Sequence, residues 1–201
     1  MTADEHPRAK TTIESLAKLP SVFKKDGRVT AGNASGICDG AAANVIASEA
    51  ALKDQNLKPL ARIISYGVSA CEPSIMGIGP VEAIRMAMSR SGGLKMQDID
   101  MWEVNEAFAA QFLSVQKELE LPNDKTNMFG GAVGEFHIAL FKGRRLNLTD
   151  FFAAVGHPLG ASGARIMANL AHNLHRLNKK YAVGAACIGG GQGIAIVIER
   201  V

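Results

Sequence analysis

Residues 181–201, YAVGAACIGGGQGIAIVIERV, contain two short apolar runs joined by a glycine-rich stretch. Each run has the length and composition of a buried strand, and the glycines between them are typical of a tight turn. The stretch therefore predicts a pair of strands near the carboxyl end of the chain. It does not predict a phosphate-binding loop, because no Lys-Ser or Lys-Thr follows the glycines and the next element is a strand.

Upstream of this pair, strand-like and helical patterns alternate. Strands are predicted at residues 61–68 and 100–104, and helices at 49–56, 80–90, 106–120 and 162–179. Such alternation predicts right-handed crossovers and an α/β fold built in layers. Residues 1–40 are polar and loop-rich, with one helical patch at 12–19. The apolar run 41–48 fits a helix or a strand equally well, because its pattern favours neither period.

Composition excludes several classes of function. The 201 residues carry 22 basic and 19 acidic side chains, a formal net charge of +3 that indicates neither a nucleic-acid nor a membrane partner. No apolar run reaches the roughly 18–20 residues of a membrane helix. The three cysteines lie far apart and predict no disulfide framework. The first residues have neither the apolar stretch of a signal peptide nor the bias of a transit peptide, so no targeting signal is visible in this chain.

The glycine-rich stretch has two interpretations. It is either a plain hairpin turn or a place where a substrate approaches the backbone, so that the N–H of Gly189 faces a developing oxyanion. In the second case the thiol of Cys187, at the end of the preceding run, is placed to donate or accept a proton.

Two further residues are candidates for chemistry. His157 precedes Pro158 and a predicted helix, where a histidine is either structural or, at the end of an α/β unit, part of a ligand site. Asn105 lies between a predicted strand and a helix, and its alternative role is that of a helix N-cap.

Four other titratable residues are assigned no chemistry. The carboxylates on either side of Asn105 need not converge, and the two helical histidines, although three residues apart, lack a third metal ligand and are expected in solvent. These residues are Glu103, Glu106, His172 and His175.

Taken together, the motifs resemble the signature blocks of thiolases. The matching stretches, in the family's order, are TAGNASG at 30–36 with DGAA at 39–42, NEAFA at 105–109, GHP at 156–158 and CIGGG at 187–191. The first of them is similar to the family's CoA-contacting segment. The resemblance covers nearly the whole chain except residues 133–154, and SIMGIGP at 74–80 is most similar to the mitochondrial branch.

The resemblance implies an α/β, thiolase-type layered fold. Residues 1–40 are then the end of the CoA-contacting loop domain, and 41–60 the last elements of the N-terminal half, with 41–48 as a strand. Residues 61–201 are the C-terminal βαβαβαββ domain. An insertion of about 20 residues occupies 133–154, where alternating apolar residues favour a projecting β-hairpin over a disordered loop. The family also implies a dimer or tetramer and the mitochondrial matrix.

The implied reaction is cleavage of a 3-ketoacyl-CoA by CoA, which gives acetyl-CoA and a shortened acyl-CoA in fatty-acid β-oxidation. By match of motif, His157 would take a proton from the nucleophilic thiol and, with a water held by Asn105, bind the thioester oxyanion. Cys187 would act as acid and then base, Gly189 would serve the other oxyanion hole, and Ser35 would touch the pantetheine of CoA. Coenzyme A enters as co-substrate; no bound cofactor or metal is implied.

The nucleophile of the family lies in its first half, and neither Cys38 nor Cys71 has the surroundings that it has there. Cys38 is expected to be a small packing residue. Two functions therefore remain open. One is a thiolase-family acyltransferase, of which this chain is a truncated form. The other is a non-catalytic fragment that binds CoA or pairs with thiolase subunits without turnover of its own.

Overall fold

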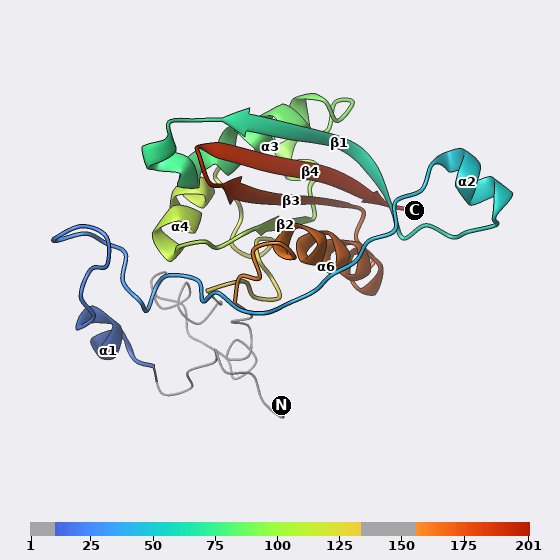
Figure 1. The fold of residues 1–201 in the computed structure, drawn as a ribbon. Coiled ribbons are helices and arrows are strands. Elements are labelled where there is room, and N and C mark those ends of the chain that lie inside the picture. The colour runs from blue at the N-terminus through green and yellow to red at the C-terminus, as the bar shows by residue number, and fades with distance from the viewer. Residues whose placement is uncertain (1–10, 134–155) are drawn as a thin grey trace.

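The computed structural model describes residues 11–133 and 156–201, and within them one mixed sheet forms the centre of the fold. Its four strands lie in the order β1-β4-β3-β2 (Figure 1). Their bounds are Ala61–Ala70 for β1, Met101–Val104 for β2, Tyr181–Ile188 for β3 and Gln192–Arg200 for β4. β4 runs antiparallel to both of its neighbours, whereas β2 and β3 are parallel.

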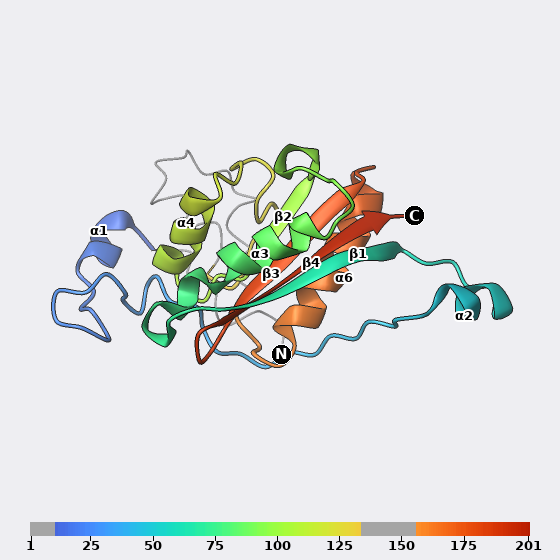
Figure 2. The same cartoon turned by 90° about the horizontal axis from the view of Figure 1, so that it is seen from above.

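Helices cover both faces of the sheet, so the fold has three layers (Figures 1 and 2). α3 (Gly79–Ser89) packs on one face, beside α4 (Ala109–Glu118) and the 3-10 helix η1 (Pro73–Ile78). α6 (Ser162–Arg176) packs on the other face, mainly against β3. The remaining short helices are α1 (Ile13–Ala17), α2 (Glu49–Asp54) and η2 (Met96–Asp98). The predicted α/β class is confirmed.

Each helical layer buries the apolar face that its sequence pattern predicts. Val81 and Ile84 of α3 lie in one core together with Trp102 and Phe112. On the opposite face, residues 166, 170 and 174 of α6 pack against β-strand side chains in a second core. Burial of each such side chain contributes roughly 1.5–3 kcal/mol, and this burial fixes both helices on the sheet.

Beyond β2 the sheet continues as a single bridge. Thr126 pairs in parallel with Trp102. The next residue, Asn127, has a left-handed backbone with φ of 49°. Its side-chain amide completes the ladder: Oδ1 accepts a hydrogen bond from the Val104 N–H at 2.9 Å, and Nδ2 donates to the Val104 carbonyl at 2.9 Å. The side chain of Asn127 thus makes the two hydrogen bonds to Val104 that the backbone of a neighbouring strand would otherwise make.

The prediction of a strand at residues 41–48 is wrong. The segment is extended but forms no ladder, and Val45 and Ile46 are 92% and 70% exposed. It runs along α6 rather than along an edge of the sheet, and the Asn44 Nδ2 donates to the Ala164 carbonyl at 3.0 Å (Figure 1). A strand requires a neighbour for its N–H and C=O groups, and no described strand lies beside this segment.

The predicted insertion hairpin at 133–154 falls almost wholly outside the described residues. The assignment of residues 1–40, 41–60 and 61–201 to separate thiolase domains stays a prediction. Within the described ranges, no helix has the length and apolar character needed to cross a bilayer.

Candidate active site

Cys187 lies on β3 at the mouth of the predicted turn. It pairs with Gly193 of β4, and the turn between the strands contains Gly190 and Gly191 with φ of 85° and 86°, values that favour glycine. The hairpin is therefore confirmed. Burial raises the pKa of the Cys187 thiol, and the nearby charge of Cys71 raises it further, although a backbone hydrogen bond acts in the opposite direction. Cys187 is thus a protonated thiol at neutral pH.

Gly189 begins this turn and is exposed. The position that a Cβ would occupy has no other heavy atom within 4 Å. The backbone at Gly189 is consequently open to a ligand, as a role in an oxyanion hole requires.

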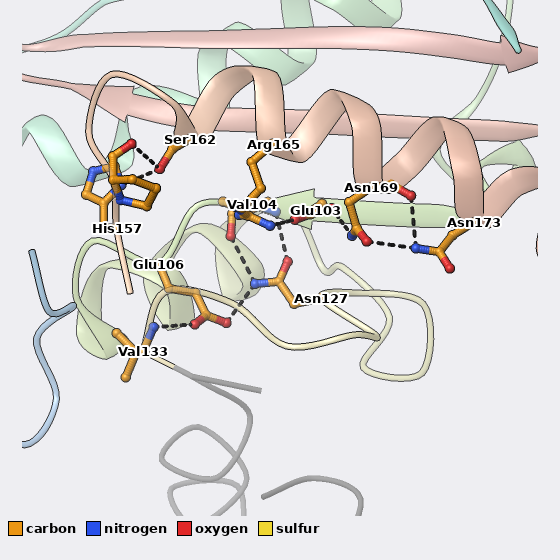
Figure 3. Close-up of polar contacts among 11 residues, drawn as sticks. Glu103, Val104, Glu106, Asn127, Val133, His157, Ser162, Arg165, Asn169 and Asn173 are labelled. Carbon is orange, nitrogen blue, oxygen red and sulfur yellow. Dashed lines mark hydrogen bonds and ion pairs between the residues drawn. The ribbon is translucent and has the colours of Figure 1, made fainter. Parts of the chain in front are cut away.

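The imidazole of His157 is held by the first residue of α6. Its Nδ1 lies 2.6 Å from the Ser162 Oγ, and that hydroxyl donates to the Pro158 carbonyl at 3.2 Å (Figure 3). The hydroxyl has only one proton, so when it donates to Pro158 it accepts a hydrogen bond from Nδ1–H. Nε2 then keeps a free lone pair, which is the form that a general base needs.

The electrostatic surroundings of His157 favour the same form. Burial lowers the pKa of its imidazole, and the positive charge of Arg165 lowers it further. His157 is therefore neutral at pH 7 and able to accept a proton. The sequence motif identified the histidine, but it gave no sign of Ser162 as its partner.

Asn105 lies directly after β2, and its backbone N–H donates to the Ala185 carbonyl of β3 at 2.8 Å. The residue is 2% exposed, and neither its Oδ1 nor its Nδ2 has a hydrogen-bond partner within the described residues. It is not the N-cap of α4, because that helix begins four residues later and is preceded by Phe108. An unpaired buried polar group costs about 1–3 kcal/mol, so the amide is unexplained by the fold alone.

The two glutamates beside Asn105 serve the fold (Figure 3). Glu103 forms an ion pair with Arg165 at 2.7 Å and accepts from Asn169 at 2.6 Å. Burial raises the pKa of the Glu103 carboxyl, while the Arg165 charge acts in the opposite direction. Glu106 accepts hydrogen bonds from Asn127 Nδ2 and from the Val133 N–H. Each glutamate thus connects β2 or its following turn to another part of the fold.

The topology places Cys187 and Asn105 at the same end of the sheet, because β2 and β3 are parallel neighbours with Val104 opposite Ala185. His157 reaches this region through residues 33–40. The Ser35 N–H donates to the Ala107 carbonyl at 3.0 Å, and Ile37 forms a parallel bridge with His157. The backbone of Ser35, the predicted CoA contact, therefore lies between the turn that follows Asn105 and the His157 loop.

Among the described residues, the remaining cysteines and histidines either contact the fold or face solvent. Cys38 packs against Gly156, and the Cys71 N–H donates to the Gly191 carbonyl at 2.7 Å. His172 is exposed, and the Nε2 of His175 lies 2.6 Å from the Leu60 carbonyl. The part of the chain that the structure describes contains no group of three or more metal-binding side chains.

Comparison with known proteins gives two matching family profiles. The profile described as "Thiolase, C-terminal domain" matches residues 57–150 and 138–200, and "Thiolase, N-terminal domain" matches residues 1–50.

Individual relatives agree with these profiles. The mouse (Mus musculus) mitochondrial 3-ketoacyl-CoA thiolase is 57% identical over 200 residues, which are 100% of this chain and 45% of that protein. The human (Homo sapiens) protein of the same name is 56% identical over 199 residues, which are 99% and 45% of the two chains. This chain therefore spans less than half the length of these relatives.

Solved structures show the same fold. The structure of human mitochondrial 3-ketoacyl-CoA thiolase in complex with CoA superposes with a TM-score of 0.82 at 51% identity, over 100% of this chain and 46% of that chain. The Bacillus anthracis acetyl-CoA acetyltransferase superposes with a TM-score of 0.84 at 44% identity, over 98% and 45%. With a family profile that covers most of its length and an α/β fold shared with these enzymes, the chain belongs to the thiolase family.

Proposed function

We propose that these residues form the acid/base half of a thiolase that cleaves 3-ketoacyl-CoA with coenzyme A. The observation that carries the proposal is the buried amide of Asn105 at the end of β2, which has no hydrogen-bond partner among residues 11–133 and 156–201. It lies at the same end of the sheet as the protonated thiol of Cys187, and residues 33–40 connect it to the neutral imidazole of His157. The amide bonds to no described group of the fold, whereas it could bond to an oxyanion or to a water beside the oxyanion.

In the proposed reaction, a thiolate attacks the keto carbon of the substrate and the bond between the α- and β-carbons breaks. The electron pair goes to the α-carbon of the departing acetyl-CoA, which takes its proton from Cys187. The resulting Cys187 thiolate then removes the proton of the incoming CoA thiol, and the CoA thiolate attacks the acyl carbonyl carbon, which forms the shortened acyl-CoA and releases the nucleophilic thiolate. A raised thiol pKa suits this sequence, because the first task of Cys187 is to donate a proton.

His157 would act on the nucleophile. With its Nδ1 proton held by the Ser162 hydroxyl, the free Nε2 can take the proton of the attacking thiol. Gly189, whose backbone is open, would donate to the enolate oxygen, and Ser35 would contact the pantetheine arm of CoA.

The nucleophilic thiol itself would come from polypeptide equivalent to the part of the relatives outside the matched 45%. Each cysteine in the described residues has another setting: Cys38 packs under Gly156, Cys71 belongs to the end of the β1 ladder, and Cys187 serves as the acid. We therefore expect no thiolysis by the 201 residues alone, since acid/base groups without an acyl acceptor cannot complete the reaction.

Pairing without turnover is a second candidate function. Residues 41–60 are almost entirely exposed and include the apolar side chains Val45 and Ile46, which favours contact with another thiolase subunit or half. Assembly as a dimer or tetramer and location in the mitochondrial matrix belong to the same proposal; the mitochondrial relatives support only the location.

A thiolysis assay tests the proposed function. Acetoacetyl-CoA and CoA are incubated with the purified chain, with a separately produced N-terminal half of the human relative, and with both. We expect activity only in the mixture, and we expect it to disappear with Cys187→Ala. Cys187-dependent cleavage by the chain alone would contradict the assignment of the nucleophile. A mixture that forms a stable complex but remains inactive would favour pairing without turnover.

A further inference from the structure

One segment contacts both the turn that follows Asn105 and the His157 loop, although it is far from each of them in the sequence. We call residues 33–40 the strap. At its first end, the Asn33 carbonyl accepts from the Ala109 N–H at 2.8 Å and the Ser35 N–H donates to the Ala107 carbonyl at 3.0 Å. Ala34 also pairs antiparallel with Phe108. The strap is therefore bonded to residues 107–109, where the turn that follows Asn105 leads into α4.

The second end of the strap is bonded to the His157 loop. The Gly36 carbonyl accepts from the His157 N–H at 2.7 Å, and Ile37 forms the parallel bridge with His157. A Cβ added to Gly156 would lie 2.6 Å from the Cys38 Sγ, and one added to Gly40 would lie 2.7 Å from the Pro158 Cβ. Strap and loop are thus in contact on both sides of the histidine, with no room for another carbon atom.

The strap is also anchored internally. Asn33 is 8% exposed; its Oδ1 accepts from the Thr30 N–H at 2.9 Å, and its Nδ2 donates to the Arg28 carbonyl at 2.8 Å. These bonds fix the turn from which the strap begins. A rigid start and two bonded ends leave little freedom for movement of one catalytic segment relative to the other.

We propose that the strap is a positioning element that sets the place of the His157 imidazole relative to the Asn105 amide. The proposal rests on the proposed function, because it gives both side chains a part in one reaction. Its physical basis is that catalysis tolerates little misplacement: an error of about 1 Å lowers a rate roughly a hundredfold. Within the strap, the four residues 33–36 are bonded both to the turn that follows Asn105 and to the His157 loop.

Two glycine substitutions provide a matched test. Neither Gly40 nor Gly160 has the left-handed backbone that excludes alanine. A Cβ at Gly40 collides with Pro158, whereas a Cβ at Gly160, three residues after His157 in the same loop, meets nothing within 4 Å. Gly40→Ala therefore forces the strap and the His157 loop apart, and Gly160→Ala makes the same chemical change without a collision.

The readout is NMR of the 201-residue chain without substrate. The ring nitrogen shifts of His157, identified by their loss in His157→Asn, report the tautomer, and hydrogen exchange reports the His157 N–H bond to Gly36. In Gly40→Ala we expect at least tenfold faster exchange at this amide and a loss of the single Nδ1–H tautomer. We expect neither change in Gly160→Ala, and none at the Asn105 N–H in either variant.

Unchanged His157 signals in a folded Gly40→Ala protein would overturn the proposal, as would equal changes in both glycine variants. If Gly40→Ala does not fold, Cys38→Ala replaces it, because loss of the sulfur frees Gly156 without a collision. The same changes at His157 are then expected, and their absence overturns the proposal. These signals require no turnover, so a strap effect combined with an inactive two-half mixture would count against the proposed function alone.

Discussion

Asn105 offers a test in which stability and function should change in opposite directions. In Asn105→Ala, two buried polar atoms that have no partner in the described part of the chain are removed, and each costs at least about 1 kcal/mol in the native state. The vacated space is roughly the 30 Å³ of one water molecule. At about 24 cal/mol per Å³, the cavity costs about 0.7 kcal/mol. We therefore expect the free energy of unfolding to rise by about 1 kcal/mol.

Urea and thermal unfolding of the isolated chain, followed by circular dichroism, measure this effect. A rise of about 1 kcal/mol corresponds to an increase in Tm of about 2–4 °C for a chain of this size. Asn127→Ala is the contrasting variant, because its equally buried amide bonds to Val104 and Glu106. Its loss should cost about 3 kcal/mol or more, since it leaves buried partners unpaired.

The same Asn105 substitution should lower the turnover of the two-half mixture by about 10²–10³, the usual effect of removing an oxyanion-hole donor. A loss of stability above about 1 kcal/mol in Asn105→Ala would refute the reasoning, because it would mean that the amide has a structural partner.

Three further predictions follow from the surroundings of the site and from the segments beside it. The pKa of His157 is lowered in the folded chain, so the stability that the neutral imidazole provides is complete above its ordinary pKa and is lost as the pH falls through the folded value. The Tm of the chain should therefore fall below about pH 6.5, and the Tm of His157→Gln should fall less. The exposed apolar residues of the segment 41–60, such as Val45 and Ile46, should cause dye binding and association of the isolated chain; a monodisperse monomer that binds no dye would contradict this. Deletion of residues 134–153 from a two-half protein that contains them should raise turnover, because the insertion leads directly into the His157 loop; equal turnover with and without them would exclude a disturbance.

Much of the fold could be predicted because its elements carry local patterns. The helix faces of α3 and α6 and the hairpin 181–200 follow from apolar period and glycine placement. The prediction of a strand at 41–48 was wrong, because an apolar run indicates burial or an extended backbone but does not identify the neighbouring strand that would supply its hydrogen bonds. Asn105 as an N-cap failed for a related reason: its turn continues to Phe108 before α4 begins.

The connections within the candidate site could not be predicted. Ser162 stands five residues after His157 at an ordinary helix start, and nothing local indicates that its hydroxyl fixes the imidazole. The use of Asn127 as strand backbone depends on a left-handed conformation and on a strand 23 residues away. The strap depends on contacts between residues more than 70 positions apart in the sequence, which composition and period do not encode.

Solvent deuterium exchange at the acetyl methyl group of acetyl-CoA tests the central claim most directly, because it isolates the proton transfer assigned to Cys187. The chain, combined with the N-terminal half of the human relative, is incubated with acetyl-CoA in deuterated buffer, and label is measured by mass spectrometry. We predict exchange that is at least about 10²-fold slower in Cys187→Ala, in line with the loss of a general acid/base. Exchange at the same rate in Cys187→Ala would contradict the assignment of Cys187 as the acid and base of this site.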